Sequence, residues 1–309
     1  MSEVIVVRTD HWDELLDGFI EDDLRRAERE IVIVADESRE EVPVPAGLTK
    51  IVADPARLGL FTTHDTMWRC GDYAIHAALD ALPRASSFWL IEPDVRIHGS
   101  NVKRFFDGSG AGADWDFLTA HFVPSGPQWR WHATMTPFAP RVYLCMMQLC
   151  RISRVAARRL FDQRLRLAES FGGDDFRPEA WPNDEAFVLS VLAASAFSFA
   201  RLSDHAPDHS TSGFTFTKPT SAKWLQSSPQ ENALYHPVVA GGKFLARARA
   251  YLAERAYAAS RPEDILKEFE TGFLPQVRTE CGDDAAIVYQ REIRQVAAWV
   301  ARRQKPTRT

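Results

Sequence analysis

Two carboxylates that lie two residues apart are the clearest candidates for chemistry in this sequence. Glu92 and Asp94 follow the apolar run at residues 88–91, which is typical of a buried strand. Carboxylate oxygens bind Mg²⁺ or Mn²⁺, and such a cation can bridge the phosphates of a diphosphate. The alternative is a solvated turn, because two acids often stand together at a strand end. The pair predicts a cation site that would stabilise a diphosphate leaving group.

The elements before this pair predict how it is positioned. Apolar patterns predict strands at residues 4–7, 31–34, 48–53 and 88–91, and helices after Asp10, as N-cap, and over 64–82. This order of strands and helices is typical of an open, mostly parallel α/β sheet flanked by helices. Ligands bind such sheets beyond the carboxyl ends of the strands.

Polar residues follow two other predicted strands. Thr9 and Asp10 end the first strand, and Asp36 ends the second. We expect them to lie near Glu92 and to hold the base and ribose of a nucleotide. Helix capping by Asp10 and a simple turn at Asp36 are the alternatives.

The rest of the chain is less regular until its last quarter. The pattern predicts strands at residues 114–121, 129–136 and 143–151, helices at 153–168 and 183–194, a long loop at 203–232, and helices at 244–258, 262–269 and 285–302. We therefore expect a nucleotide-sugar-binding and catalytic domain at residues 1–240. A helical extension at residues 241–309 would pack on the same domain.

Residues 66–99 resemble the GT-A superfamily of glycosyltransferases, most closely bacterial members with a Trp-x-x-Glu-x-Asp-Val pattern, here residues 89–95. The resemblance covers about residues 1–240. It implies a Rossmann-related fold and transfer of a sugar, a hexose in our interpretation, from a nucleoside diphosphate donor to a hydroxyl acceptor with Mn²⁺ or Mg²⁺. Glu92 replaces the common first Asp of the motif, so the number of direct metal ligands stays open, and Asp94 is the direct ligand that we expect.

Two later segments look like parts of the same family. Residues 182–187 resemble the acidic helix start that supplies the base on the acceptor side, which implies a catalytic role for Asp184 or Glu185. Residues 234–237 resemble the late histidine segment that completes the metal site, which implies that His236 is a ligand. Helix capping and a structural histidine are the alternatives. Whether transfer inverts or retains the anomeric centre stays open.

Three weaker signals concern anion binding. The resemblance favours a nucleotide contact for Asp72, against simple pairing with Arg69 on an exposed helix face. Gly241 and Gly242 precede Lys243 at a helix start, where backbone N–H groups and Lys243 could bind phosphate. The arginines of the 153–168 helix predict either a solvated face or contact with an anionic membrane or a lipid-phosphate acceptor.

Composition excludes some classes of protein. The 309 residues carry 37 Lys and Arg against 42 Asp and Glu, a net charge of −5, which argues against a nucleic-acid partner. The four cysteines lack the spacing of a zinc site. We see neither a signal peptide nor an apolar run that could span a bilayer, so we expect a cytoplasmic protein with room for a peripheral contact at the inner membrane surface.

Two other functions compete with sugar transfer to a carbohydrate or lipid-linked acceptor. A nucleotidyltransferase shares this type of sheet, but it usually has a glycine-rich loop after the first strand. Residues 8–12 contain no glycine. A protein that binds a nucleotide or a sugar without turnover is the non-enzymatic alternative.

Overall fold

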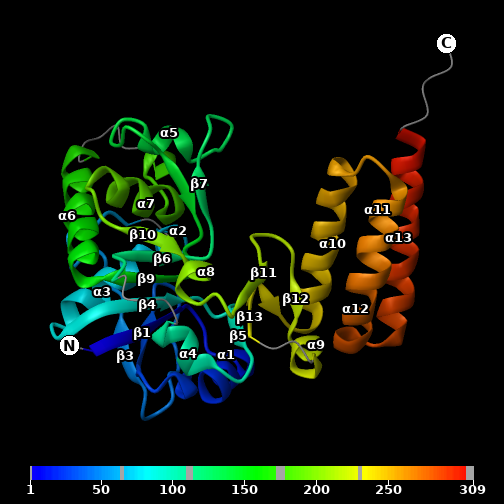
Figure 1. The fold of residues 1–309 in the computed structure, drawn as a ribbon, viewed down its shortest axis with the longest axis horizontal. Helices are drawn as coiled ribbons and strands as arrows, with labels where there is room; N and C mark the ends of the chain where they lie inside the picture. The colour runs from blue at the N-terminus through cyan, green and yellow to red at the C-terminus, as the bar shows by residue number, and fades with distance from the viewer. Residues whose placement is uncertain (1, 63–65, 109–113, 172–177, 229–231, 304–309) are drawn as a thin grey trace. The chain divides into compact units, whose positions relative to one another are not determined.

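The computed structural model describes residues 2–62, 66–108, 114–171, 178–228 and 232–303. The chain forms two compact units (Figure 1). Unit 1 comprises Met1–Val95 and Ser100–Thr211, and unit 2 comprises Arg96–Gly99 and Ser212–Thr309. The division therefore falls near residue 211, ahead of the expected boundary at residue 240. The assignment of catalysis to residues 1–240 stays a prediction.

A seven-stranded sheet forms the centre of unit 1. Its strands, in spatial order, are β10 (Phe199–Arg201), β6 (Phe117–Thr119), β9 (Leu149–Ser153), β4 (Ala85–Ile91), β1 (Ser2–Thr9), β2 (Glu30–Ala35) and β3 (Thr49–Val52). Only β9 runs antiparallel to its neighbours β4 and β6 among these strands. The expected α/β class with an open, mostly parallel sheet is confirmed.

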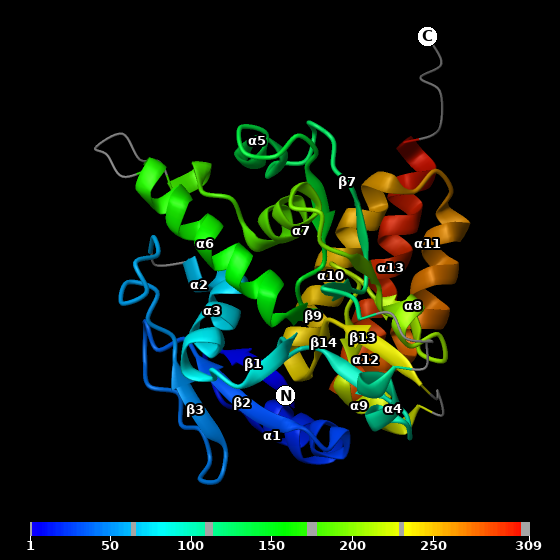
Figure 2. The same cartoon turned by 60° about the vertical axis from the view of Figure 1, so that its left-hand side comes forward.

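Helices cover both faces of this sheet because its strands are apolar on both sides. Val4 and Val6 face a core that they share with α3 (Asp72–Ala81), α6 (Arg154–Phe171) and α7 (Asp184–Ala194). Figure 2 shows α3 and α6, which pack against each other. On the other face, the Trp89 ring lies 5.0 Å from Phe106 of α4 (Val102–Asp107). Near-continuous apolar strands are the usual consequence of such double coverage.

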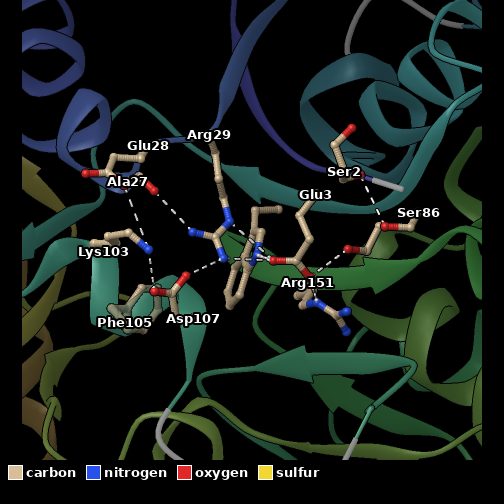
Figure 3. Close-up of polar contacts among 12 residues, drawn as sticks. Ser2, Glu3, Ala27, Glu28, Arg29, Ser86, Lys103, Phe105, Asp107 and Arg151 are labelled. Atoms are coloured by element: carbon tan, nitrogen blue, oxygen red, sulfur yellow. Dashed lines mark hydrogen bonds and ion pairs between the residues drawn. The ribbon is translucent and has the colours of Figure 1, made fainter.

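A polar cluster lies at the amino end of β1 (Figure 3). The Glu3 carboxylate accepts hydrogen bonds from Arg151 Nε at 2.6 Å, Ser87 Oγ at 2.8 Å and Arg29 Nη2 at 3.2 Å. Burial raises the pKa of Glu3, but the charge of Arg151 and these hydrogen bonds outweigh it, so the pKa is lowered. Glu3, Arg29 and Arg151 line a pocket of about 410 Å³. Because these side chains bind one another, the cluster stabilises the sheet at this end of β1.

Two helices of unit 1 differ from the prediction, one in its N-cap residue and one in its continuity. Asp13, rather than Asp10, caps α1 (Glu14–Gly18), because its Oδ1 accepts from the Leu16 N–H at 2.8 Å. The helix expected over 64–82 is two helices, α2 (Thr66–Arg69) and α3, with Gly71 between them. Residues 63–65 lie outside the described residues.

In the middle of unit 1, one strand predicted from alternating side chains is wrong. Residues 129–136 were expected to be a strand, and they contain the short helix α5 (His132–Met135). The expected strand at 143–151 is two strands, because β8 (Tyr143–Cys145) turns away to pair with β7 (Phe122–Pro124). The remaining part, β9, enters the sheet. Alternating side chains alone do not distinguish these outcomes.

The basic helix α6 is confirmed, but three of its five arginine side chains do not form a solvated face. Arg164 is fully buried, Arg154 donates to the carbonyl of Leu82 at 2.8 Å, and Arg159 donates to Ser195 Oγ at 3.0 Å. These contacts hold α6 against the rest of unit 1. The expected lipid-binding face on this helix therefore loses three of its arginines.

Unit 2 begins with short strands where a long loop was expected. β5 (Arg96–His98), β13 (Ala233–His236) and β11 (Ser210–Phe214) form a three-stranded sheet, and β12 (Thr220–Ser221) pairs with β14 (Val238–Val239). The segment 203–232 also contains α9 (Ala222–Ser227), most of α8 (Leu202–His205) and residues 229–231, which lie outside the described residues. The sequence did not predict these elements, because Ser, Thr and Pro are typical of loops and because the strands are short and pair with distant segments.

Helices make up the rest of unit 2. They are α10 (Gly241–Ala258), α11 (Pro262–Glu268), α12 (Leu274–Cys281) and α13 (Asp283–Arg303), around a core that includes Phe244, Phe269, Phe273, Tyr289 and Ile293 (Figure 1). Three of the four were predicted, and α12 was missed. Within the described ranges, none of the helices combines the length and the apolar character needed to cross a bilayer.

Candidate functional site

The strand order of unit 1 has a switch point between β1 and β4. The chain builds β1, β2 and β3 outward in one direction and then places β4 on the other side of β1. The carboxyl ends of β1 and β4 therefore flank the crevice where open α/β sheets bind ligands. Arg8 and Thr9 lie at the end of β1, and Glu92 follows β4 directly.

An ion pair joins the two strands at this switch point. Arg8 Nη2 contacts Glu92 Oε1, and Arg8 Nη1 donates to the Met67 carbonyl at 2.6 Å. Burial lowers the pKa of Arg8, but the charges of Glu92 and Asp184 outweigh it, so the pKa is raised. The two side chains are 11% and 17% exposed, which makes the pair mostly desolvated. The pair engages Oε1 of Glu92, and the role of Glu92 as a cation ligand stays a prediction.

A pocket of about 290 Å³ lies at the carboxyl ends of β2 and β3. Its lining includes Asp36, Ser38, Val52, Thr62, Thr66 and Met67. Six of its eleven lining residues are polar and three of these are acidic, and its volume is near the lower end of the range for small-molecule sites. Asp36 lies where its role in nucleotide binding was expected, and its Oδ1 accepts from the Ser38 N–H at 3.0 Å.

The end of β1 lies next to Asp36 but does not line this pocket. The Asp36 N–H donates to the Thr9 carbonyl at 2.8 Å. The Thr9 hydroxyl donates to the His11 carbonyl at 2.5 Å, and Asp10 Oδ1 lies 2.6 Å from His11 Nδ1. Thr9 and Asp10 thus shape the turn that leaves the sheet, and their nucleotide contacts stay a prediction.

Asn183, Asp184 and Glu185 open α7, and each has a different environment. Asn183 is the N-cap, because its Oδ1 accepts from the Ala186 N–H at 3.1 Å. Asp184 is 6% exposed and accepts from the N–H groups of Gly71 at 2.7 Å and Glu185 at 2.8 Å. Burial and the neighbouring Glu185 raise the pKa of Asp184 well above its ordinary value. The capping alternative therefore holds for Asn183, while Asp184 joins α7 to the start of α3.

Glu185 is the more accessible acid of the pair. Its Oε1 accepts from Gln148 Nε2 at 3.3 Å, and its Oε2 accepts from Asn183 Nδ2 at 3.4 Å. The carbonyl of the same Gln148 accepts from the Glu92 N–H at 2.9 Å. Gln148 therefore links the acid after β4 to the acid on α7.

Arg8 and Gln148 were not predicted from the sequence. Arg8 meets Glu92 across 84 positions of the chain, and Gln148 meets Glu185 across 37. No local pattern marks either residue. The one available signal is that Arg8 is a charge within an apolar strand, and buried charges require a partner.

Asp72 has a different role from the expected nucleotide contact. Its carboxylate accepts from Arg164 Nε at 2.7 Å and Nη2 at 2.9 Å, and His76 Nε2 lies 3.2 Å away. All three side chains are fully or almost fully buried. The alternative of an exposed pair with Arg69 is equally wrong. Asp72 holds α3 against α6 in the core of unit 1.

The phosphate role of Lys243 stays a prediction, although the helix start beside it already binds an acid of the chain. The N–H of Gly241, at the start of α10, donates to Glu280 Oε1 at 2.7 Å. Glu280 Oε2 accepts from Ser221 Oγ at 2.7 Å and from the Lys223 N–H at 3.0 Å. A carboxylate of the chain itself thus occupies the helix start that was expected to bind phosphate.

His236 has a hydrogen bond that suits a metal ligand. Its Nδ1 donates to the Thr215 carbonyl at 2.7 Å, since a carbonyl can only accept. This fixes the tautomer and leaves the lone pair on Nε2, the arrangement typical of metal-binding histidines. Glu92 and Asp94 belong to unit 1 and His236 to unit 2, so a cation shared by them stays a prediction.

No family model matches the sequence, and no curated protein matches it either. Solved structures share parts of the fold at low identity. A glycosyltransferase involved in the glycosylation of the major capsid of PBCV-1 is 10% identical, with a TM-score of 0.39 over 81% of this chain and 98% of that one. Glucosyl-3-phosphoglycerate synthase from Mycobacterium tuberculosis, solved with Mn²⁺, UDP-glucose and phosphoglyceric acid, is 12% identical, with a TM-score of 0.35 over 59% and 68%. The mannosyltransferase Ktr4p from S. cerevisiae is 12% identical, with a TM-score of 0.41 over 66% and 69%. Similarities this distant do not assign an activity.

Proposed function

We propose that the chain is a metal-dependent glycosyltransferase of the GT-A type, which moves a sugar from a nucleoside diphosphate to a hydroxyl acceptor. The observation that carries this proposal is the link through Gln148. This residue binds the backbone of Glu92 at the switch point and the side chain of Glu185 on α7. An acid suited to be a base is thus tied to the strand end that carries the proposed cation site. Both groups lie at the edge where such sheets bind ligands.

The donor would lie along the carboxyl ends of β1 to β4. The pocket beside Asp36 would take the nucleoside, and Asp94 would bind the cation with His236. The tautomer of His236 supports the second assignment. So does the register of unit 2, in which Tyr235 pairs with Arg96, two residues after Asp94. When bound, Mn²⁺ or Mg²⁺ would stabilise the negative charge of the diphosphate leaving group.

Glu185 is the base that we propose for deprotonating the acceptor hydroxyl. It is partly exposed, and its hydrogen bonds to Gln148 and Asn183 orient its carboxylate without burying it. Asp184 is a poorer choice, because both of its oxygens accept from backbone N–H groups. If transfer retains the anomeric centre, Glu185 would position the acceptor instead.

The proposal is tested by incubating the chain with a panel of nucleotide sugars and Mn²⁺. We expect one donor to raise the melting temperature and to release a nucleoside diphosphate. Release of pyrophosphate from a nucleoside triphosphate and a sugar phosphate would instead identify the competing nucleotidyltransferase. Binding of a nucleotide sugar without either product would support the non-catalytic alternative.

A further inference from the structure

An exposed group of aromatic and basic side chains lies at one end of the helices of unit 2. We call it the aromatic–basic patch, and it consists of Tyr257 near the end of α10 and Trp299, Arg302 and Arg303 in the last turns of α13. Tyr257 is 74% exposed and Trp299 is 37% exposed, although both are large apolar side chains. Exposed aromatic pairs of this kind often mark a surface that binds another surface.

The contacts within the patch hold its rings in place. The ring centroids of Tyr257 and Trp299 lie 5.6 Å apart, and Arg303 stacks over the Trp299 ring at 5.0 Å. Arg303 Nη2 donates to the carbonyls of Tyr257 at 3.2 Å and Ala259 at 3.3 Å. The patch is therefore preorganised, so its side chains lose little conformational entropy when they bind.

The charge around the patch is positive. Residues 293–303 contain three arginines and no acid. The acids nearest in the sequence are Glu254, one helical turn before Tyr257 on α10, and Glu263 and Asp264 at the start of α11, where Arg261 pairs with Asp264 at 2.7 Å. An anionic partner fits this distribution.

We propose that the aromatic–basic patch binds the surface of an anionic lipid bilayer. Trp and Tyr favour the boundary between headgroups and acyl chains, because one end of each ring system is apolar and the other is polar. Arginine lays its stem along apolar surface while its guanidinium contacts phosphate. This contact differs from the one expected on α6, where three arginines bind inside unit 1. It is independent of the proposed sugar transfer.

The test is co-sedimentation of the full chain with vesicles. We expect binding to phosphatidylcholine vesicles that contain 30% phosphatidylglycerol in 50 mM salt, and little binding to pure phosphatidylcholine. The double variant Arg302→Gln/Arg303→Gln should bind about 30-fold more weakly, because each basic residue at an anionic surface contributes about five-fold. Tyr257→Ser should weaken binding as well, whereas Phe216→Ser, at another exposed aromatic of unit 2, should not.

A matched control uses the two exposed arginines of α6. Arg158→Gln/Arg166→Gln removes the same charge, and it should leave vesicle binding unchanged. Equal loss in both double variants would overturn the assignment, since binding would then follow net charge alone. Absence of binding by the parent chain at 50 mM salt would also overturn it. The proposal would also be overturned if the parent chain bound single-stranded RNA but not vesicles, and if the α13 double variant lost the RNA binding.

Discussion

The N–H of Gly71 donates a 2.7 Å hydrogen bond to Asp184 Oδ2, which joins the start of α3 to the start of α7 across 113 positions of the chain. The same close approach brings Arg8 to both residues, since a Cβ atom on Gly71 would lie 2.6 Å from Asp184 Oδ2 and 3.1 Å from Arg8 Nη1. Three segments of unit 1 therefore meet where glycine leaves room.

Gly71→Ala tests this junction. We expect a loss of about 1–3 kcal/mol in the free energy of unfolding, as for other overpacked sites, because Asp184 or Arg8 must move. Gly18→Ala is the matched control, since its Cβ would approach no atom closer than 3.8 Å and its backbone is helical. Urea unfolding of both variants measures the difference. Equal stability of the two variants would show that Asp184 and Arg8 can move to accommodate the added methyl group at little cost.

Arg8→Met tests the ion pair at the switch point. Removing one partner leaves the Glu92 carboxylate mostly buried without its cation, which typically costs about 3–5 kcal/mol for a buried pair. Adding Glu92→Gln to Arg8→Met should recover part of this loss. Arg25→Gln, which breaks the exposed pair with Glu21, should leave the melting temperature unchanged. An Arg8→Met protein that melts like the parent would mean that water or another group compensates Glu92.

Asp94→Asn tests the proposed cation site. We expect the Kd for a nucleoside diphosphate in Mn²⁺ to rise by more than the roughly 10–100-fold seen when an outer-shell partner of a metal is lost. The melting temperature should stay the same, because Asp94 lies at a partly exposed strand end. Isothermal titration with Mn²⁺ and with EDTA separates the metal-dependent part. Asp162→Asn, at an exposed acid of α6, is the control, and unchanged affinity in Asp94→Asn would refute the assignment.

Glu185→Gln tests the proposed base. The amide keeps the size of the side chain but cannot accept a proton at neutral pH, so we expect transfer to fall by about 10²–10⁴-fold with donor binding retained. Asp184→Asn should behave differently, because an amide offers one acceptor oxygen to two backbone N–H groups. We expect it to lower stability by about 1–3 kcal/mol. Parental rates in both variants would mean that neither acid is an essential base.

The core pair of Asp72 and His76 predicts acid sensitivity. Burial raises the pKa of Asp72, but Arg164 outweighs it and holds the pKa below the ordinary 3.8, so its contribution to stability is present above that pH and lost below it. Burial lowers the pKa of His76 below 6.5, despite Asp72, so unfolding gains a proton as the pH falls through 6.5. Stability should therefore decline below pH 6.5 and again below about 4.

Urea unfolding between pH 7.5 and 3 measures this profile. Asp72→Asn should reduce the lower step, to which Glu3 and Glu280 also contribute through their lowered pKa. It should cost about 3–5 kcal/mol at pH 7, because it leaves Arg164 buried without its counter-ion. His76→Gln should reduce the upper step alone, because the lowered pKa of His205 and of His209 also contributes to that step. A profile that is flat from pH 7.5 to 4 would contradict the role of His76.

Local sequence patterns predicted the helices and strands that can be recognised without knowing which distant segments they pair with. The apolar runs of β1, β2 and β4 and the acidic start of α7 each carry their own signal in the sequence. Residues 129–136 do not, because both a strand and a turn followed by α5 accommodate their pattern. The long loop expected at 203–232 failed for a related reason, since β11 becomes a strand only beside β13.

The candidate site could be predicted only in part. Asp36, Glu92 and Asp94 stand out because each follows a strand, and Asn183 because it precedes a helix. Arg8 and Gln148 do not stand out, because their partners are supplied by the order of strands in the sheet. Asp72 shows the reverse error. An acid on a helix next to the expected site was predicted to be a ligand, but it forms an ion pair with Arg164, 92 positions away.

The placement of β5 has a consequence for how the chain is made. β5 ends at His98, and its partner β13 begins at Ala233, so 135 residues (233 − 98) must be synthesised before the pair can form. At about 5–20 residues per second this interval is roughly 7–27 s. During it, β5 is an open strand edge within an emerging polypeptide, just after the acids of the proposed cation site. A ribosome therefore synthesises every strand of the unit 1 sheet before it makes the histidine that is proposed to bind the cation with Asp94.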